Sequence, residues 1–76
     1  MNHQDLTEAE IEGRMAYAAQ TEEQGRYRKA THLYAQLGKD IQARHGRFDC
    51  RAVHAFEGAA RAIRKGTTDE GHDDEP

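Results

Sequence analysis

The sequence predicts an all-α fold: a three-helix antiparallel bundle, made of a helical hairpin and a third helix, with a disordered acidic C-terminal tail. Apolar residues recur at spacings of three and four over three segments, and glycines at Gly25 and Gly46 separate these segments. No segment alternates polar and apolar residues as a strand does. We therefore expect one domain, residues 1–66, with helices over about 8–24, 26–44 and 50–65, and a tail over 67–76.

The first expected helix, residues 8–24, has a complete N-terminal signal. Thr7 and Glu10 form a capping box, in which each side chain satisfies a backbone donor that the helix leaves open. Leu6 and Ile11 form the matching hydrophobic staple, and Gly25 supplies the C-terminal stop. The expected inward face is formed by Ile11, Met15, Ala18 and Ala19.

The second expected helix, residues 26–44, begins directly after that turn. Its apolar side is formed by Tyr27, Ala30, Leu33, Tyr34, Leu37 and Ile41. Alanines before the turn let two antiparallel backbones approach, while tyrosines fill the space between turns, so these two segments predict a hairpin. Gly38 interrupts the far side of the apolar seam; we interpret it as a close helix crossing, with a kink as the alternative.

The third expected helix, residues 50–65, repeats the design of the first. Asp49 is the expected N-cap, and Phe48 with Val53 forms a second staple. The expected inward stripe is Val53, Phe56, Ala60 and Ile63, widened by Ala52, Ala55 and Ala59. Gly66 ends the helix, and the following residues 67–76 contain no apolar side chain, which predicts disorder.

Length and composition restrict the class of protein. A chain of 76 residues forms one domain at most, with a marginal core, so we expect it to form a homodimer or to dock on a partner. Cys50 is the single cysteine, which excludes an intrachain disulfide and is typical of a reducing compartment. No apolar run is long enough for a membrane span, and no secretory signal is recognisable. We expect a cytoplasmic protein.

Charge is organised in three blocks. Residues 1–25 carry six acids and one base, residues 26–66 carry ten bases and three acids, and residues 67–76 carry five acids and no base. One interpretation is that the acidic first helix and the two basic helices attract each other within the bundle. The other is that the basic middle segment meets an acidic partner surface or nucleic acid.

Catalytic and metal sites have no signal in the sequence. The histidines His3, His32, His45, His54 and His72 share no metal-ligand spacing. We find no glycine-rich phosphate loop and no recognisable pair of nucleophile and base. A plain buried or half-buried thiol is the expectation for Cys50. The sequence therefore predicts a non-enzymatic protein with no cofactor and no metal.

Residues 17–51 resemble the ANR family, small bacterial negative regulators that bind transcription activators of the AraC type. The residues that carry the resemblance are Ala18 and Ala19, Glu22 or Glu23, Tyr27, Ala30, Leu33, Tyr34, Phe48, Cys50 and Arg51. Tyr34 and Phe48 stand where the family usually has tryptophan, and Cys50 comes earlier than the family's terminal cysteine. The same segment is similar to a single tetratricopeptide hairpin and to MIT domains, and all three resemblances imply a helical protein-binding module.

We expect a small regulator that binds a protein partner and inhibits it; the resemblance implies an AraC-type activator as that partner. The expected contact residues, or the core beneath them, are Tyr27, Leu33, Tyr34 and Leu37, with Arg28, Lys29 and Arg51 as steering charges. Two alternatives stay open: a nucleic-acid-binding regulator, and a phage- or plasmid-borne inhibitor of a host defence complex.

Overall fold

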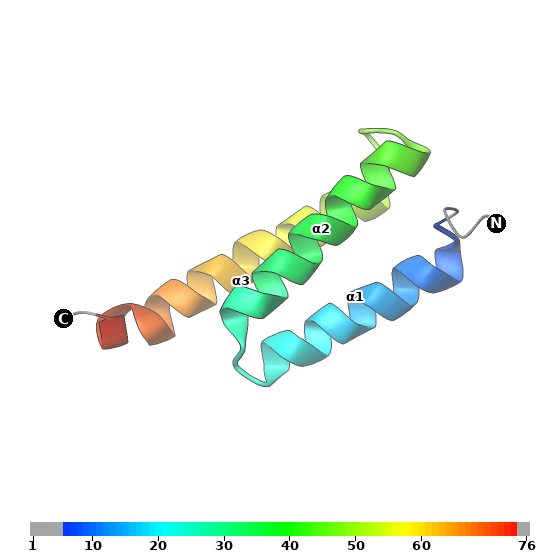
Figure 1. Ribbon diagram of the computed structural model, residues 1–76. Helices are drawn as coiled ribbons and strands as arrows, with labels where there is room; N and C mark the ends of the chain where they lie inside the picture. Colours follow the sequence, from blue (N-terminus) through cyan, green and yellow to red (C-terminus); the bar gives the residue numbers. More distant parts are fainter. Residues whose placement is uncertain (1–5, 75–76) are drawn as a thin grey trace.

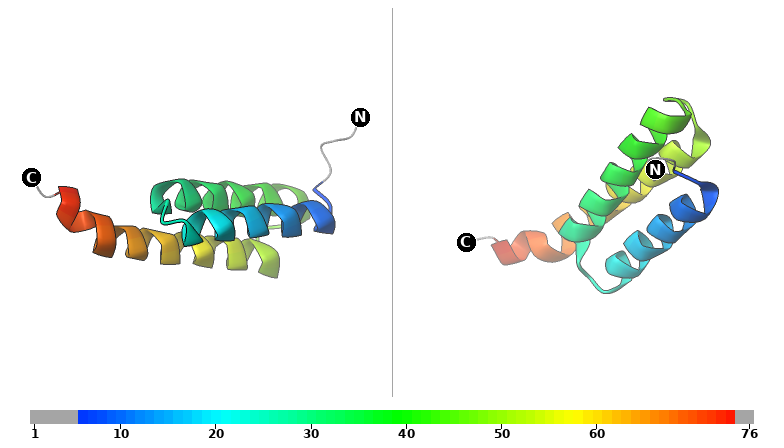
Figure 2. Two further views of the ribbon diagram at one scale, coloured as in Figure 1. Left: turned by 90° about the horizontal axis from the view of Figure 1, so that it is seen from below. Right: turned by 45° about the vertical axis from the view of Figure 1, so that its right-hand side comes forward.

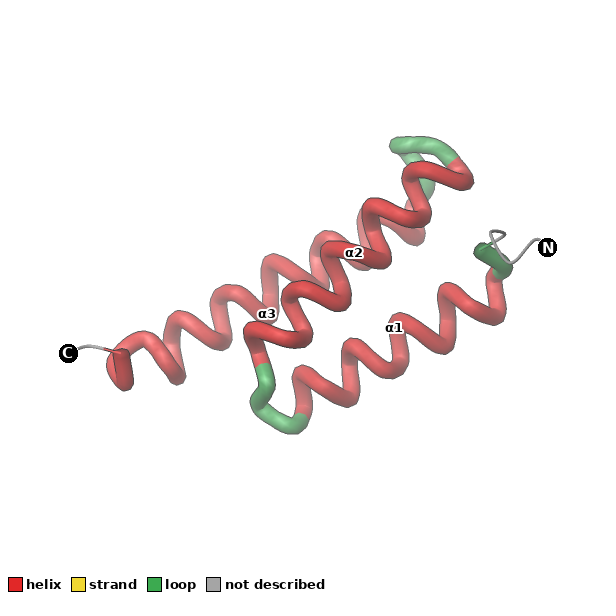
Figure 3. Tube along the Cα trace, viewed as in Figure 1, coloured by secondary structure: helices red, strands yellow, loops and turns green. Residues whose placement is uncertain are grey.

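The computed structural model describes the backbone of residues 6–74 and the side chains of residues 6–67, and within that range it is an all-α structure of three helices. Helix α1 spans Glu8–Glu23, α2 spans Tyr27–His45 and α3 spans Cys50–Asp74. Short connections join them, so that consecutive helices run antiparallel (Figures 1 and 3). The predicted fold class is confirmed.

Helix α2 is the central element of the bundle. It packs along most of α3 on one side and along α1 on the other, whereas α1 and α3 contact each other little. The result is an elongated molecule of 47 × 21 × 16 Å, and the C-terminal turns of α3 project beyond the turn that joins α1 to α2 (Figure 2). A helix hairpin, α2–α3, therefore forms the body of the molecule, and α1 lies along one of its flanks.

The core has two parts that follow each other along the bundle. The part near the N-terminus of α1 contains Leu6, Ile11, Leu37, Ile41, Ala52 and Ala55. The part near the α1–α2 turn contains Ala18, Ala30, Tyr34, Ala59 and Ala62. Met15 packs against both parts, so the core is continuous. Alanine supplies much of it, which keeps the helices close together.

The predicted helix ends of α1 are confirmed. Thr7 Oγ1 accepts the backbone N–H of Glu10, and the Glu10 carboxylate accepts the N–H of Thr7, which completes the capping box. Leu6 and Ile11 are buried in the same part of the core, as a hydrophobic staple requires. Gly25 has a φ of 82°, a conformation that side-chain-bearing residues rarely adopt, so it ends the helix as expected.

Close approach of α2 and α3 accounts for two glycines. A Cβ atom on Gly38 would lie 2.7 Å from the ring of Phe56, and one on Gly58 would lie 2.6 Å from the ring of Tyr34. Since neither distance is tolerable, each glycine admits an aromatic ring from the opposite helix. The interpretation of Gly38 as a close helix crossing is confirmed.

Helix α3 differs from its prediction at its end and on its inward face. Gly66 does not have a positive φ and packs against Tyr27, so the helix continues to Asp74 rather than ending at residue 65. The sequence predicts disorder for residues 67–76. Since the structure describes side chains only as far as Thr67, this stays a prediction. The inward face consists of alanines, Ala52, Ala55, Ala59 and Ala62, and not of the larger residues beside them.

The cap of α3 is confirmed but its staple is wrong. Asp49 Oδ1 accepts the backbone N–H of Arg51 at 2.9 Å, as an N-cap carboxylate does. Phe48, however, is 89% exposed and Val53 is 47% exposed. Because neither residue is buried, the pair expected as a staple contributes surface instead of core.

Candidate protein-binding surface

The apolar residues that the sequence marked as contacts lie mainly in the core. Tyr34 is 2% exposed and Leu37 is fully buried, so these two form the core beneath a surface and cannot touch a partner in the folded state. Tyr27 and Leu33 are half-buried: Tyr27 packs against Gly66, and Leu33 packs against the part of the core near the α1–α2 turn. They do not form an exposed strip.

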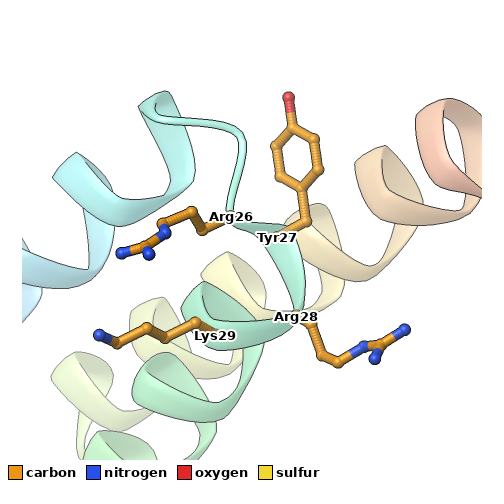
Figure 4. Close-up of a pocket in the computed structure, with 4 residues that line it drawn as sticks. All are labelled: Arg26, Tyr27, Arg28 and Lys29. Atoms are coloured by element: carbon orange, nitrogen blue, oxygen red, sulfur yellow. The ribbon is translucent and has the colours of Figure 1, made fainter.

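The first turn of α2 carries the two expected steering charges, Arg28 and Lys29. Together with Arg26 and Tyr27 they border a shallow hollow at the start of the helix (Figure 4). Figure 4 shows that Arg26 and Lys29 extend toward α1 while Arg28 extends to the other side, so the side chains diverge. The Lys29 ammonium lies 5.7 Å from the centroid of the Tyr17 ring, a cation–π contact within the bundle. Arg28 is the cation of this turn that points away from α1.

Arg51, the third expected steering charge, lies at the opposite end of the α2–α3 hairpin. Its guanidinium makes two hydrogen bonds with Asp49, of 2.9 and 2.7 Å, and an ion pair of 3.7 Å with Glu8 of α1. The hydrogen bonds that the side chain and the backbone N–H of Arg51 donate to Asp49 hold the pKa of the Asp49 carboxyl well below its usual range. Arg51 therefore belongs to the junction between α1 and α3, and the structure does not bring it together with Arg28 and Lys29.

A buried ionic cluster connects the three helices near the α1–α2 turn. Glu22 of α1 is only 5% exposed, and Arg61 of α3 donates to its two carboxylate oxygens, each at 3.0 Å. Lys65 lies 2.9 Å from Oε2 of the same carboxylate, and the Tyr34 hydroxyl donates to Oε1 at 3.1 Å. The Arg61 guanidinium also lies over the Tyr34 ring, 5.9 Å from its centroid.

The cluster fixes the ionisation of Glu22. Its hydrogen bonds with Arg61, opposed by burial and reinforced by Lys65 and Tyr34, lower the pKa of Glu22 from 4.5 to about 2. Burial and the adjacent carboxylate raise the pKa of the Tyr34 phenol. Both carboxylate oxygens of Glu22 and the hydroxyl of Tyr34 are engaged by partners within the chain, so we assign the cluster a structural role.

Large apolar side chains are exposed on the flank of α3 that faces away from α1. The flank of α3 that lies toward α1 carries the cations that pair with α1 residues, which are Arg51, Arg61 and Lys65. Helical spacing places Val53, Phe56, Ala60 and Ile63 on the other flank. Val53 and Ile63 are 47% and 53% exposed, Ala60 is exposed and Phe56 is half-buried over Gly38.

Helix α2 continues this apolar surface. The approaches of Tyr27 to Gly66 and of Tyr34 to Gly58 set an antiparallel register. It places Thr31 level with residues 61–62, next to Ile63 along the axis, and Ala35 level with residues 57–58, between Phe56 and Ala60. Thr31 and Ala35 are both half-buried. We call the resulting surface the outer flank; its members are Thr31 and Ala35 of α2 and Val53, Phe56, Ala60 and Ile63 of α3.

Sequence reasoning missed two features of the structure: the burial of Glu22 in α1 and the exposure of Val53 and Ile63 on α3. It did not find the burial of Glu22, because nothing in the sequence pairs this residue with Arg61, which lies two helices away. It placed Val53 and Ile63 in the core. The signal available was the second apolar stripe of α3, which consists of alanines and lets two helices approach closely. Cys50, expected to be buried or half-buried, is exposed.

Two further properties concern the described part of the chain alone. Within it, no three side chains among His, Cys, Asp and Glu are placed to hold a metal ion together. No helix there combines the length and the apolar character needed to cross a membrane.

Comparisons with protein-family models, with curated proteins and with solved structures found no match for this chain.

Proposed function

We propose that this chain is a small non-enzymatic regulator that binds a protein partner through its helical surface and thereby inhibits a transcription activator. The observation that carries the proposal is the exposure of Val53 and Ile63 beside the half-buried Phe56 on one flank of α3. A folded domain leaves such a contiguous apolar surface open mainly where another molecule covers it. The choice of a transcription activator rests on the resemblance of residues 17–51 to the ANR regulators.

The test is an affinity purification of the tagged chain from bacterial lysate, with and without nuclease treatment. We expect a protein to be recovered in near-stoichiometric amount and to resist nuclease. A reporter gene driven by that protein should then lose expression when the chain is co-produced, if the partner is an activator.

Recovery that collapses after nuclease treatment would contradict the proposal and favour nucleic-acid binding instead. The divergence of Arg26, Lys29 and Arg28 in Figure 4 argues against that outcome, because a nucleic-acid surface needs cations that track one backbone. A recovered protein without effect on transcription would leave partner binding in place and exclude the inhibition of an activator.

A further inference from the structure

The α2–α3 hairpin already binds one helix, α1, on its inner flank. Ile11 and Ala18 of α1 are buried against the hairpin, and acidic residues at the border of α1 pair with α3 cations. These pairs join Glu8 to Arg51 and Glu22 to Arg61 and Lys65. The hairpin thus accepts an amphipathic helix whose apolar stripe is bordered by carboxylates.

The outer flank has the same two components, an apolar strip and a basic border. Arg28 lies three residues before Thr31, and Lys39 lies four residues after Ala35, so both border the strip along α2. Both are exposed. On α3 the border carries Arg64 and one acid, Glu57. Cations therefore outnumber acids along this strip.

We propose that the outer flank binds an amphipathic helix of a partner protein whose apolar stripe is bordered by acidic residues. The inference rests on the proposed function and specifies its site and the chemistry of its partner. From Val53 to Ile63 the strip extends for about 15 Å, which matches roughly three turns of a bound helix. Burial of Val53, Ile63 and the rest of the Phe56 ring would supply the affinity, and Arg28 and Lys39 would orient the acidic border.

A second copy of this chain is the less favourable occupant. Two outer flanks placed face to face would bring Arg28 and Lys39 of each copy near the same cations of the other, and among the described residues the border of this flank holds one acid, Glu57. Like charges across an interface oppose association, whereas an acidic border removes that repulsion.

The test uses two synthetic helical peptides with the same apolar positions at spacings of three and four, one with glutamate and the other with lysine at every border position. Each is titrated into the isotope-labelled full chain and followed by NMR. We expect the glutamate peptide to shift the amide signals of Val53, Ala60 and Ile63, and to bind about ten-fold more tightly than the lysine peptide, a preference that salt reduces.

Variants locate the binding on the outer flank. Ile63→Glu should weaken the glutamate peptide about ten-fold or more, since it places a carboxylate in the apolar strip opposite an acidic border. Arg28→Glu combined with Lys39→Glu should reverse the preference between the two peptides. The matched controls are Tyr17→Ser, an exposed apolar residue on α1, and Arg26→Glu, an exposed cation directed toward α1; both should leave the affinities unchanged.

Equal affinity for the two peptides, or signal shifts confined to α1, would overturn the inference. So would a loss of binding in Tyr17→Ser as large as that in Ile63→Glu. The proposed function fails separately, when the affinity purification recovers no nuclease-resistant protein. If a protein is recovered equally well by the wild-type chain and by Ile63→Glu, partner binding stands and only its placement on the outer flank is wrong.

Discussion

Glu22 is the residue that ties the three helices together at one end of the bundle. A buried carboxylate is costly unless its oxygens are fully hydrogen-bonded, and here each oxygen has two partners. The partners come from α2 and α3, while Glu22 itself belongs to α1. Because α1 and α3 otherwise contact each other little, this cluster is a main connection between them.

Replacement of Glu22 by glutamine should destabilise the fold at neutral pH. The amide keeps the shape of the side chain but loses its charge, and its NH2 group replaces one of the two oxygens that accept hydrogen bonds from Arg61, Lys65 and Tyr34. Those partners are about half exposed, so we expect a loss of about 1–2 kcal/mol in the free energy of unfolding rather than the larger cost of breaking a fully buried pair. Urea denaturation followed by circular dichroism measures it. An unchanged midpoint would show that the cluster contributes no stability.

The contribution of Glu22 should depend on pH in a defined direction. Its folded-state pKa of about 2 lies below the ordinary value of 4.5, so the stabilisation is fully present above pH 4.5 and is lost as the pH falls through 2. The difference in unfolding free energy between wild type and Glu22→Gln should therefore shrink between pH 4.5 and pH 2. Denaturation of both proteins across this range tests it, and a difference that stays constant would contradict the assigned pKa.

Gly58 offers a test of the close approach of α2 and α3. An alanine there would place its Cβ 2.6 Å from the Tyr34 ring, which is buried and held by Glu22, so the ring cannot move away. We expect Gly58→Ala to cost about 1–3 kcal/mol. The matched control is Gly13→Ala, also within a helix but with open space around it, which should stabilise the protein by about 0.5–1 kcal/mol. Thermal melts of the two variants should shift in opposite directions.

At the scale of elements, helix existence and helix ends were predictable from the sequence because their causes are local. The capping box of Thr7 and Glu10, the stop at Gly25 and the cap by Asp49 all depend on residues within a few positions of each other. Gly66 shows the limit of this reasoning. It resembles a helix stop in sequence, but its contact with Tyr27 comes from another helix and keeps it inside α3.

The inward face of α3 was not predictable from periodicity. Two adjacent stripes of this helix are apolar, one made of alanines and the other containing Val53 and Ile63, and both follow helical spacing. The choice depends on α2, which approaches closely enough for Tyr34 to contact Gly58. A close crossing favours the smaller stripe and turns the larger residues outward. Which stripe faces α2 also decides which α3 residues are exposed, so sequence reasoning could not identify Val53 and Ile63 as surface residues.

Removal of residues 67–76 should leave the melting temperature of the bundle unchanged. The core ends at Ala62, and the deleted segment contains no apolar side chain that could add buried area. In the sequence its five acids also come at the C-terminal end of α3, where negative charge interacts unfavourably with the helix dipole. Thermal unfolding of the truncated and full chains, followed by circular dichroism, provides the measurement. A marked drop in the melting temperature would reveal a stabilising role for the tail.

At the scale of the whole molecule, the acidic first segment and the basic middle segment of the sequence lie against each other in the bundle. Carboxylates of α1 pair with cations of α3 along the inner flank, in accordance with the interpretation that the acidic and basic segments attract each other within the bundle. The pair between Arg14 and Asp40 has the opposite polarity, so the attraction is not uniform. Arg28 and Lys39 lie outside this internal compensation, beside the apolar residues of the outer flank.

The oligomeric state should respond to salt in a way that follows from this arrangement. At low ionic strength the cations bordering the outer flank repel a second copy, and we expect a monomer. Salt at 0.1 M screens the repulsion between exposed charges that lie more than about 10 Å apart but leaves apolar burial in place, so self-association should increase as salt is added. Sedimentation velocity at several salt concentrations measures it, with Ile63→Glu as the variant that should stay monomeric throughout. Dimers that dissociate on addition of salt would instead show that complementary charges hold two copies together, which the border of Arg28 and Lys39 does not provide.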